Sequence, residues 1–199
     1  ATYGDMAVKE GDEVIVTYLE HHADIVPWQM LCARKGARLR AVPLTSAGEL
    51  DMEAYMSMLS ERTRIVAVTQ ASNVLGTLPD LPRIIDAAHK AGAKVVVDGC
   101  QGIVHGSVNV SELDCDFYAF SGHKLYGPTG IGVLYGKRDL LESMPPYMGG
   151  GDMVDKVTMD NTTYAELPLK FEAGTTNYIG AIGLGEAIRY LDGTDMTAA

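Results

Sequence analysis

The sequence has few positive charges and no long apolar run. Sixteen lysine and arginine residues stand against 26 aspartate and glutamate residues, so the formal net charge is −10 over 199 residues. A nucleic-acid-binding protein needs a basic face to neutralise phosphates, so we expect no nucleic-acid partner. The longest apolar runs are only strand-sized, and the N-terminus lacks the basic, then apolar, pattern of a signal peptide. We therefore expect no membrane span and no signal peptide.

Cysteine is also scarce. Cys32, Cys100 and Cys115 are widely spaced, and no C-x-x-C pair is present. An odd number of isolated cysteines argues against a disulfide framework and against a zinc site, and it fits a reducing cytoplasm. None of the three lies in a pattern that marks a nucleophile, so we expect each to be a small buried hydrophobic residue.

Strand-like and helix-like segments alternate along the chain, without an internal repeat or a low-complexity tract. This alternation predicts an α/β domain with a mostly parallel sheet and helices on both faces. The β-branched run 94–97 should be buried on both faces. The expected strands are 14–16, 39–42, 64–69, 94–97, 116–120 and 130–135. The expected helices are 27–35, 51–59, 81–91 and 178–191.

Polar side chains follow several of the expected strands. In a parallel sheet, the carboxyl ends of the strands meet at one edge, and ligands bind there. The sequence therefore predicts a site that gathers these residues. The clusters are Glu20-His21-His22, Ser72-Asn73, Asp98-Gly99-Cys100-Gln101 and Ser121-Gly122-His123-Lys124.

Asp98 and Lys124 are the most informative pair. Asp98 directly follows a buried strand, where a carboxylate can also be a simple turn or cap residue. Lys124 follows another strand, where a lysine is either a surface residue or one that is paired or used covalently. If the two strands are neighbours, the amine and the carboxylate face one crevice. An enzyme dependent on pyridoxal phosphate (PLP) needs that combination.

The residues around this pair have suitable chemistry. The hydroxyl of Ser121 and the imidazole of His123 suit a phosphate dianion, although the glycine-rich segment after them is equally consistent with a tight turn. His21 suits stacking on an aromatic ring or a structural hydrogen bond. We predict no metal site here, because adjacent histidines on an extended chain point in opposite directions. The amides of Gln101 and Asn73 suit a phenolic oxygen or stabilisation of a turn.

Five segments together resemble a known family. They are EHHADIVPW at 20–28, SNVLG at 72–76, VDGCQ at 97–101, FSGHKLYGPTG at 120–130 and FEAGT at 171–175. In this order they are similar to motifs of the group II (SufS/CsdA-like) cysteine desulfurases, in the class V aminotransferase family. The likeness runs from about Gly11 to the end of the sequence. The chain departs from the motifs at Asp24, where the family has asparagine, and at Cys100, where it has alanine.

The resemblance implies a PLP-dependent transferase of fold type I, with residues 1–199 forming the PLP-binding large domain. Lys124 would bond covalently to the cofactor, and Asp98 would pair with the pyridine nitrogen. His21 would stack on the cofactor ring and assist proton transfer. These three residues are the expected catalytic groups.

The resemblance also assigns the other cofactor contacts. Gln101 and Asn73 would contact the side of the ring that carries the oxygen. Ser121 and His123 would hold the phosphate. Thr175 would reach the phosphate bound by a partner subunit, which implies a homodimer.

The activity implied is conversion of L-cysteine to L-alanine, with the sulfur passed as a persulfide to a protein acceptor for iron–sulfur cluster or other sulfur-compound assembly. Two alternatives stay open: a selenocysteine lyase or another class V lyase, and a truncated, non-catalytic binding or dimerisation fragment. The family's phosphate loop, nucleophilic cysteine and substrate-binding arginine match no position here. We therefore expect a fragment that lacks an N-terminal segment and a C-terminal small domain and is inactive by itself.

Overall fold

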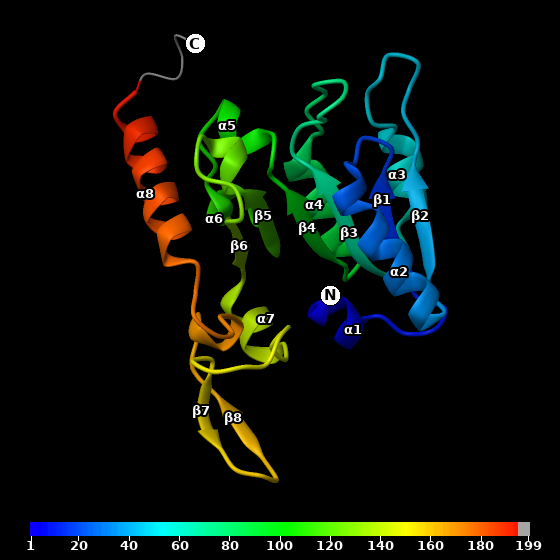
Figure 1. Ribbon diagram of the computed structural model, residues 1–199. Coiled ribbons are helices and arrows are strands. Elements are labelled where there is room, and N and C mark those ends of the chain that lie inside the picture. The colour runs from blue at the N-terminus through cyan, green and yellow to red at the C-terminus, as the bar shows by residue number, and fades with distance from the viewer. Residues whose placement is uncertain (195–199) are drawn as a thin grey trace.

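A six-stranded sheet forms the centre of the protein. The computed structural model describes residues 1–194. The strand order is β2-β1-β3-β4-β5-β6; the first five strands are parallel, and β6 pairs antiparallel with β5 (Figure 1). The strands are β1 (Glu13–Thr17), β2 (Arg38–Val42), β3 (Thr63–Thr69), β4 (Lys94–Asp98), β5 (Phe117–Ser121) and β6 (Gly132–Gly136). The predicted α/β class with a mostly parallel sheet is confirmed.

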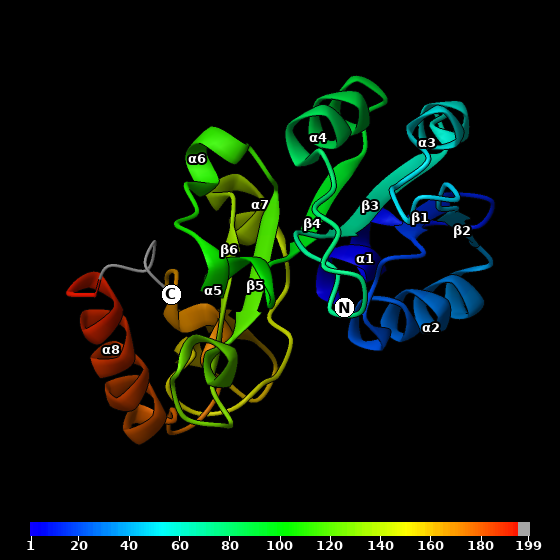
Figure 2. The same cartoon turned by 90° about the horizontal axis from the view of Figure 1, so that it is seen from above.

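Helices lie on both faces of this sheet. Figure 2 shows α3 and α4 on one side and α1 and α2 on the other. Among the described residues, no helix is long and apolar enough to cross a bilayer. The α-helices are α1 (Thr2–Ala7), α2 (Val26–Lys35), α3 (Met52–Met58), α4 (Leu81–Lys90), α5 (Gly102–His105), α6 (Val110–Leu113), α7 (Arg138–Ser143) and α8 (Tyr178–Asp192). Three 3-10 helices complete the set: η1 (His22–Asp24), η2 (Gly122–Leu125) and η3 (Leu169–Phe171).

Local sequence signals set the limits of the longer helices. The Asp51 and Asp80 side chains cap α3 and α4 by accepting the backbone N–H groups of Ala54 and Arg83. An N-cap oxygen satisfies a donor that the first helical turn leaves unpaired. Gly36 ends α2 with φ of 67°, a left-handed conformation that glycine adopts without strain.

The main core lies between the sheet and the α3–α4 layer. Every residue of β1 is buried. In β4, by contrast, Val95 and Val97 are fully buried, whereas Val96 is half-buried. The prediction that the 94–97 run is buried on both faces is therefore wrong for one face, where Val96 packs against the smaller clusters under α1 and α7.

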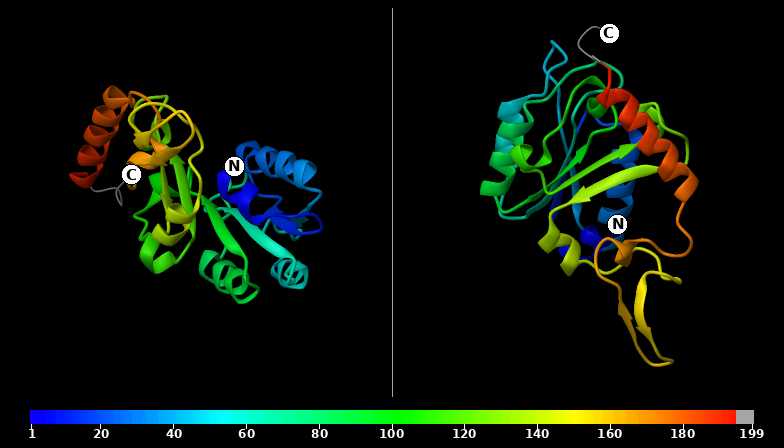
Figure 3. Two further views of the ribbon diagram at one scale, coloured as in Figure 1. Left: turned by 90° about the horizontal axis from the view of Figure 1, so that it is seen from below. Right: turned by 90° about the vertical axis from the view of Figure 1, so that its left-hand side faces the viewer.

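Two features were not expected from the sequence. A hairpin of β7 (Val154–Val157) and β8 (Thr162–Tyr164) projects from the sheet domain (Figure 3). Helix α8 packs against η2, and Leu184 lies close to Gly122 and Gly127. The helix thus supports the turn that carries Lys124.

Candidate active site

Strands β4 and β5 are neighbours, so Asp98 and the Lys124 turn lie at one edge of the sheet. Asp98 is paired in register with Ala119 of β5, two residues before that strand ends at Ser121. Lys124 follows within η2. The two strands that precede Asp98 and Lys124 are therefore neighbours, which is what a shared crevice requires.

Asp98 is held by the turn that follows it. Its Oδ1 accepts the backbone N–H of Cys100 at 2.9 Å, and the backbone N–H of Gly99 donates to the Ala119 carbonyl at 2.9 Å. The turn role considered for Asp98 is thus present. It also fixes the orientation of a half-buried carboxylate at the mouth of β4.

Gly99 allows the β4 turn to lie against β5. A Cβ at position 99 would fall 2.0 Å from the ring of Tyr118. Tyr118 is buried, and its hydroxyl donates to the side-chain oxygen of Gln70 after β3. Only a glycine fits between these neighbours. The ends of β3, β4 and β5 are therefore tightly packed against one another at this edge.

Lys124 is half-buried and lies between the buried residues Gly122 and Leu125. Within the described part of the chain, no carboxylate oxygen lies within 4.0 Å of its ammonium group. Other lysines, such as Lys90 and Lys137, do form ion pairs. A half-buried lysine without a neutralising partner at a strand end is suited to a covalent or ligand-binding task.

Ser121 and Cys100 connect the two strand ends. The thiol of Cys100 donates to Ser121 Oγ at 3.8 Å. Ser121 is the N-cap residue of η2, but its side chain makes no capping bond. His123 is exposed in the same turn. The hydroxyl and imidazole expected to bind phosphate therefore flank Lys124, as predicted from their spacing.

The amides lie on the neighbouring strand ends, and neither stabilises its turn. Gln101 is half-buried at the start of α5 and makes no side-chain cap bond. The turn after β3 is held by Ser72 Oγ, which accepts the N–H groups of Val74 and Leu75 at 3.3 Å each. Asn73, in that turn, is exposed.

His21 has an extended backbone, with φ of −69° and ψ of 153°, as expected, and only the chain after it turns into η1. It is the N-cap of η1, and its Nδ1 accepts the N–H of Ala23 at 3.1 Å. The neutral ring therefore carries its proton on Nε2. The rings of His21 and His22 lie 5.8 Å apart, centroid to centroid. The expectation that the two rings point in opposite directions is therefore wrong, because the 3-10 turn begins at His22 and the chain is not extended there.

Thr175 lies apart from these strand ends. It is exposed in the segment before α8, where Asn177 Nδ2 donates to the Gly130 carbonyl at 3.2 Å. Within residues 1–194, no hydrogen bond joins Thr175 to the other predicted site residues. Its expected role toward a partner subunit stays a prediction.

Two buried carboxyl groups beneath His21 received no role in the sequence analysis. Glu20 and Asp24 are each 8% exposed. Glu20 accepts the hydroxyl of Thr17, and Asp24 accepts the indole N–H of Trp28 at 2.9 Å. The only available signal was Asp24, which stands where the family motif has asparagine.

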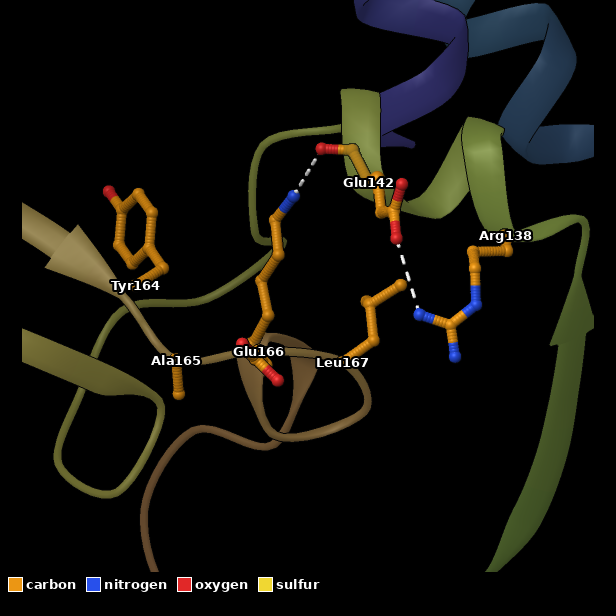
Figure 4. A pocket seen from close by; sticks show the side chains of 7 residues that line it. Arg138, Glu142, Tyr164, Ala165, Glu166 and Leu167 are labelled. Atoms are coloured by element: carbon orange, nitrogen blue, oxygen red, sulfur yellow. Dashed lines mark hydrogen bonds and ion pairs between the residues drawn. The ribbon is translucent and has the colours of Figure 1, made fainter.

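Two hollows in the surface are lined by none of the predicted site residues. The one in Figure 4 is lined by residues of α7, β8 and η3; in it Lys170 donates to the Glu142 carbonyl at 2.9 Å and Arg138 pairs with the Glu142 carboxylate at 3.2 Å. Because β6 runs antiparallel, α7 follows it at the opposite edge of the sheet. These charges already have partners, so we place the candidate site at the strand ends.

Comparison with known proteins assigns the family. The class-V aminotransferase family matches residues 1–199. The chain belongs to the class-V aminotransferase family. It is 56% identical over 191 residues to a cysteine desulfurase of Enterobacter sp. (strain 638), covering 96% of this chain and 47% of that protein. The chain thus spans about half the length of the curated relatives it matches.

Solved structures agree with this assignment. The cysteine desulfurase CsdA from Escherichia coli is 50% identical and superposes with a TM-score of 0.95, covering 98% of this chain and 49% of CsdA. A mutant of C-DES with glycine covalently linked to its PLP cofactor is 27% identical, with a TM-score of 0.84, and covers 98% of this chain and 54% of C-DES. The resemblance to the SufS/CsdA-like cysteine desulfurases and the expected PLP-dependent transferase fold are confirmed.

Proposed function

We propose that this chain is the PLP-binding large domain of a cysteine desulfurase. In the overall reaction, L-cysteine and a protein thiol give L-alanine and a protein persulfide. The sulfur atom moves from the substrate's β-carbon to the thiol sulfur, and a hydrogen replaces it on carbon. The observation that carries the proposal is the placement of Asp98 and Lys124 on neighbouring strand ends, in a chain whose relatives are named cysteine desulfurases.

The donor set at this edge fits PLP. The cofactor has an aldehyde, a basic ring nitrogen, a ring oxygen and a phosphate, and each needs a different partner. The edge offers the ammonium of Lys124, which has no ion-pair partner among residues 1–194, and an oriented carboxylate on Asp98. It also offers the hydroxyl of Ser121, the amide of Gln101 and the imidazole of His123.

When bound, the cofactor supplies a protonated aromatic ring that stabilises negative charge developing on the substrate. Lys124 would hold the cofactor through its aldehyde, and its amine would move a proton at the substrate's α-carbon. Asp98 keeps the ring nitrogen protonated by pairing its negative charge with that proton. His21 would stack on the cofactor ring and assist proton transfer through Nε2, because its Nδ1 accepts the backbone N–H of Ala23.

The remaining residues orient the cofactor. Gln101 and Asn73 donate amide hydrogens toward the ring oxygen, while Ser121 and His123 bind the phosphate. Thr175, exposed before α8, contacts the phosphate of a second subunit. These residues would act by positioning the cofactor.

The persulfide forms on a thiol other than Cys32, Cys100 or Cys115. Burial raises the pKa of the Cys32 and Cys100 thiols, and it raises that of Cys115 to about 11. A nucleophilic cysteine needs a lowered pKa, because the thiolate is the reactive form. Cys100 is further disfavoured by the hydrogen bond and charge of Asp98.

A homodimer is the proposed assembly. Four large apolar side chains of α8 are 60–72% exposed: Tyr178, Ile179, Ile182 and Tyr190. Exposed apolar surface of this kind marks a protein interface. We further propose a protein sulfur acceptor, a role in assembling iron–sulfur clusters or other sulfur compounds, and a cytoplasmic location, which the three free cysteines support.

The test is product analysis with L-cysteine, PLP and a reductant, using the protein that contains these residues. The proposal expects L-alanine and sulfide in equal amounts, and loss of at least about 100-fold in Lys124→Ala. Formation of pyruvate and ammonia would instead indicate a carbon–sulfur lyase. Strong preference for L-selenocysteine, with little turnover of L-cysteine, would indicate a selenocysteine lyase.

A further inference from the structure

Glu20 and Asp24 each have one buried oxygen without a hydrogen-bond donor. Within residues 1–194, Glu20 Oε2 and Asp24 Oδ2 have no partner when both groups are ionised. The other oxygen of each is satisfied, by the Thr17 hydroxyl on Glu20 Oε1 and by the Trp28 indole on Asp24 Oδ1. Two buried acceptors cannot satisfy each other, and leaving both unpaired is costly.

One proton shared between the two groups gives both of these oxygens a hydrogen-bond partner. The two carboxyl groups lie on the same short loop, on either side of His21, and each has one buried oxygen without a partner, so a proton on Glu20 can be donated to Asp24. Two carboxylates in a shared site cannot both ionise at low cost, so one retains a proton. We propose that Glu20 and Asp24 together bind one proton at neutral pH, and that this proton makes Asp24 a positioning residue for His21.

The link to His21 follows from the chain. His21 lies between the two acids and is the N-cap of η1, the single turn that ends at Asp24. The Glu20–Asp24 bond therefore closes the loop that carries the His21 ring. If the proton leaves, two buried negative charges face each other across this loop and push it open. This step rests on the proposed role of His21 at the cofactor, whereas the shared proton itself does not.

The pH range follows from burial. Desolvation, followed by the charge of Asp24, raises the pKa of Glu20 from 4.5 to about 9. Desolvation raises the pKa of Asp24 from 3.8 to about 7, and Asp98 adds to this shift. Both pKa values are thus raised above the ordinary range of a carboxyl group, so the pair keeps a proton at neutral pH and loses it at alkaline pH.

The charged groups around the pair come from four directions. On the loop itself, His21 and His22 are exposed. From β4, Asp98 adds negative charge. The nearest cations on the packed elements lie at far ends and are already paired: Arg64 of β3 with Asp12, and Arg34 and Lys35 of α2 with Asp5. None of these three cations on the packed elements is thus placed to replace the proton.

An amide can replace the proton without titrating. In Asp24→Asn, the side-chain NH₂ donates to Glu20 Oε2, while the remaining oxygen still accepts from Trp28. In Glu20→Gln, the NH₂ donates to Asp24 Oδ2, while the remaining oxygen still accepts from Thr17. The two substitutions therefore give matched variants of nearly unchanged shape, each with a permanent hydrogen bond.

Trp28 provides a built-in probe. It is the one tryptophan in the sequence, and its indole N–H bonds directly to Asp24. The experiment is a fluorescence titration of the full 199-residue chain without cofactor, from about pH 6 to about pH 10, a range that spans the raised values. The wild-type protein should show a reversible change in Trp28 emission with an alkaline midpoint, and Asp24→Asn and Glu20→Gln should both lack it.

Circular dichroism confirms that each variant is folded, and Glu20→Gln keeps the test decisive if Asp24→Asn does not fold. Trp28→Phe identifies the source of the signal. The same alkaline transition in a folded amide variant, or no transition in the wild type, overturns the proposal. Because no cofactor is present, failure here leaves the proposed PLP site untouched, and failure of that site leaves this result unaffected.

For the link to His21, the holoenzyme is assayed across the same pH range. Activity per bound cofactor should fall at alkaline pH in the wild type, and this fall should be reduced in Asp24→Asn. Identical alkaline limbs in the two proteins would refute the positioning role of Asp24 even if the fluorescence titration succeeds.

Discussion

The thiol of Cys100 lies 3.8 Å from the hydroxyl of Ser121 and donates to it. This contact joins the turn after β4 to the end of β5, the two neighbouring strand ends that carry Asp98 and Lys124 at one edge of the sheet. The proposed PLP site depends on this junction, because its carboxylate and its amine come from different strands.

Asp98→Asn should separate cofactor binding from catalysis. An amide keeps the shape of the side chain but cannot hold a ring proton by charge. Turnover should fall by at least about 100-fold, as for the loss of one electrostatic catalytic group, while cofactor content falls much less. Steady-state kinetics and absorbance of the bound cofactor measure the two quantities, and near-normal turnover would count against the role of Asp98.

Gly99→Ala should destabilise the edge. The new methyl group would lie 2.0 Å from the Tyr118 ring, so the turn or the ring must move. Overpacking of this kind costs about 1–3 kcal/mol. Gly106→Ala is the matched control, because a Cβ there meets nothing within 4 Å and the residue has extended backbone with φ of 178°.

Denaturant unfolding of both variants measures the difference. The free energy of unfolding should fall in Gly99→Ala and stay near the wild-type value in Gly106→Ala. Equal stability of the two variants would show that the β4 turn is not packed against Tyr118 as described.

Cys100→Ser should leave the sulfur chemistry intact. The hydroxyl can still donate to Ser121, and burial together with Asp98 raises the pKa of the Cys100 thiol, which makes it a poor nucleophile. Alanine formation by the holoenzyme should therefore change little, and native Cys100 should react slowly with iodoacetamide at neutral pH. Complete loss of alanine formation would make Cys100 a participant in the reaction.

Asp24→Asn should also change how stability depends on pH. Burial raises the pKa of both carboxyls in the folded state, so the folded chain binds more protons than the unfolded chain above their ordinary range. The free energy of unfolding therefore falls as pH rises toward the raised value of about 9 for Glu20. The fall should be shallower in Asp24→Asn, measured by urea unfolding at a series of pH values; parallel curves would contradict it.

Much of the fold could be predicted from the sequence, because strand and helix periods are local signals. The strand-end clusters around Asp98 and Lys124 were found for the same reason. The order of the strands in the sheet is not encoded locally. Whether Asp98 and Lys124 lie near each other depends on that order, so the sequence alone does not decide it. The contact of Gly99 with Tyr118 depends on the packing of β4 beside β5, which no spacing reveals.

Other features were missed for different reasons. The β7–β8 hairpin is short and mostly exposed, so it lacks the apolar alternation by which a half-buried strand is recognised. The 3-10 turn that begins at His22 is not predictable, because a turn of three residues leaves no periodic signal. The buried state of Glu20 and Asp24 could not be predicted, because acidic residues are rarely buried unless paired, and their pairing is tertiary.

The most direct test of the central claim is to locate the bond between the protein and PLP. The holoprotein is reduced with borohydride, digested and analysed by mass spectrometry, with Lys124→Ala and Lys90→Ala alongside; Lys90 is an exposed lysine of α4 paired with Asp86. The account predicts one reduced pyridoxyl group, on Lys124, in the wild type and in Lys90→Ala, and none in Lys124→Ala. A pyridoxyl group on another lysine of the wild-type protein, or one retained in Lys124→Ala, would contradict the account.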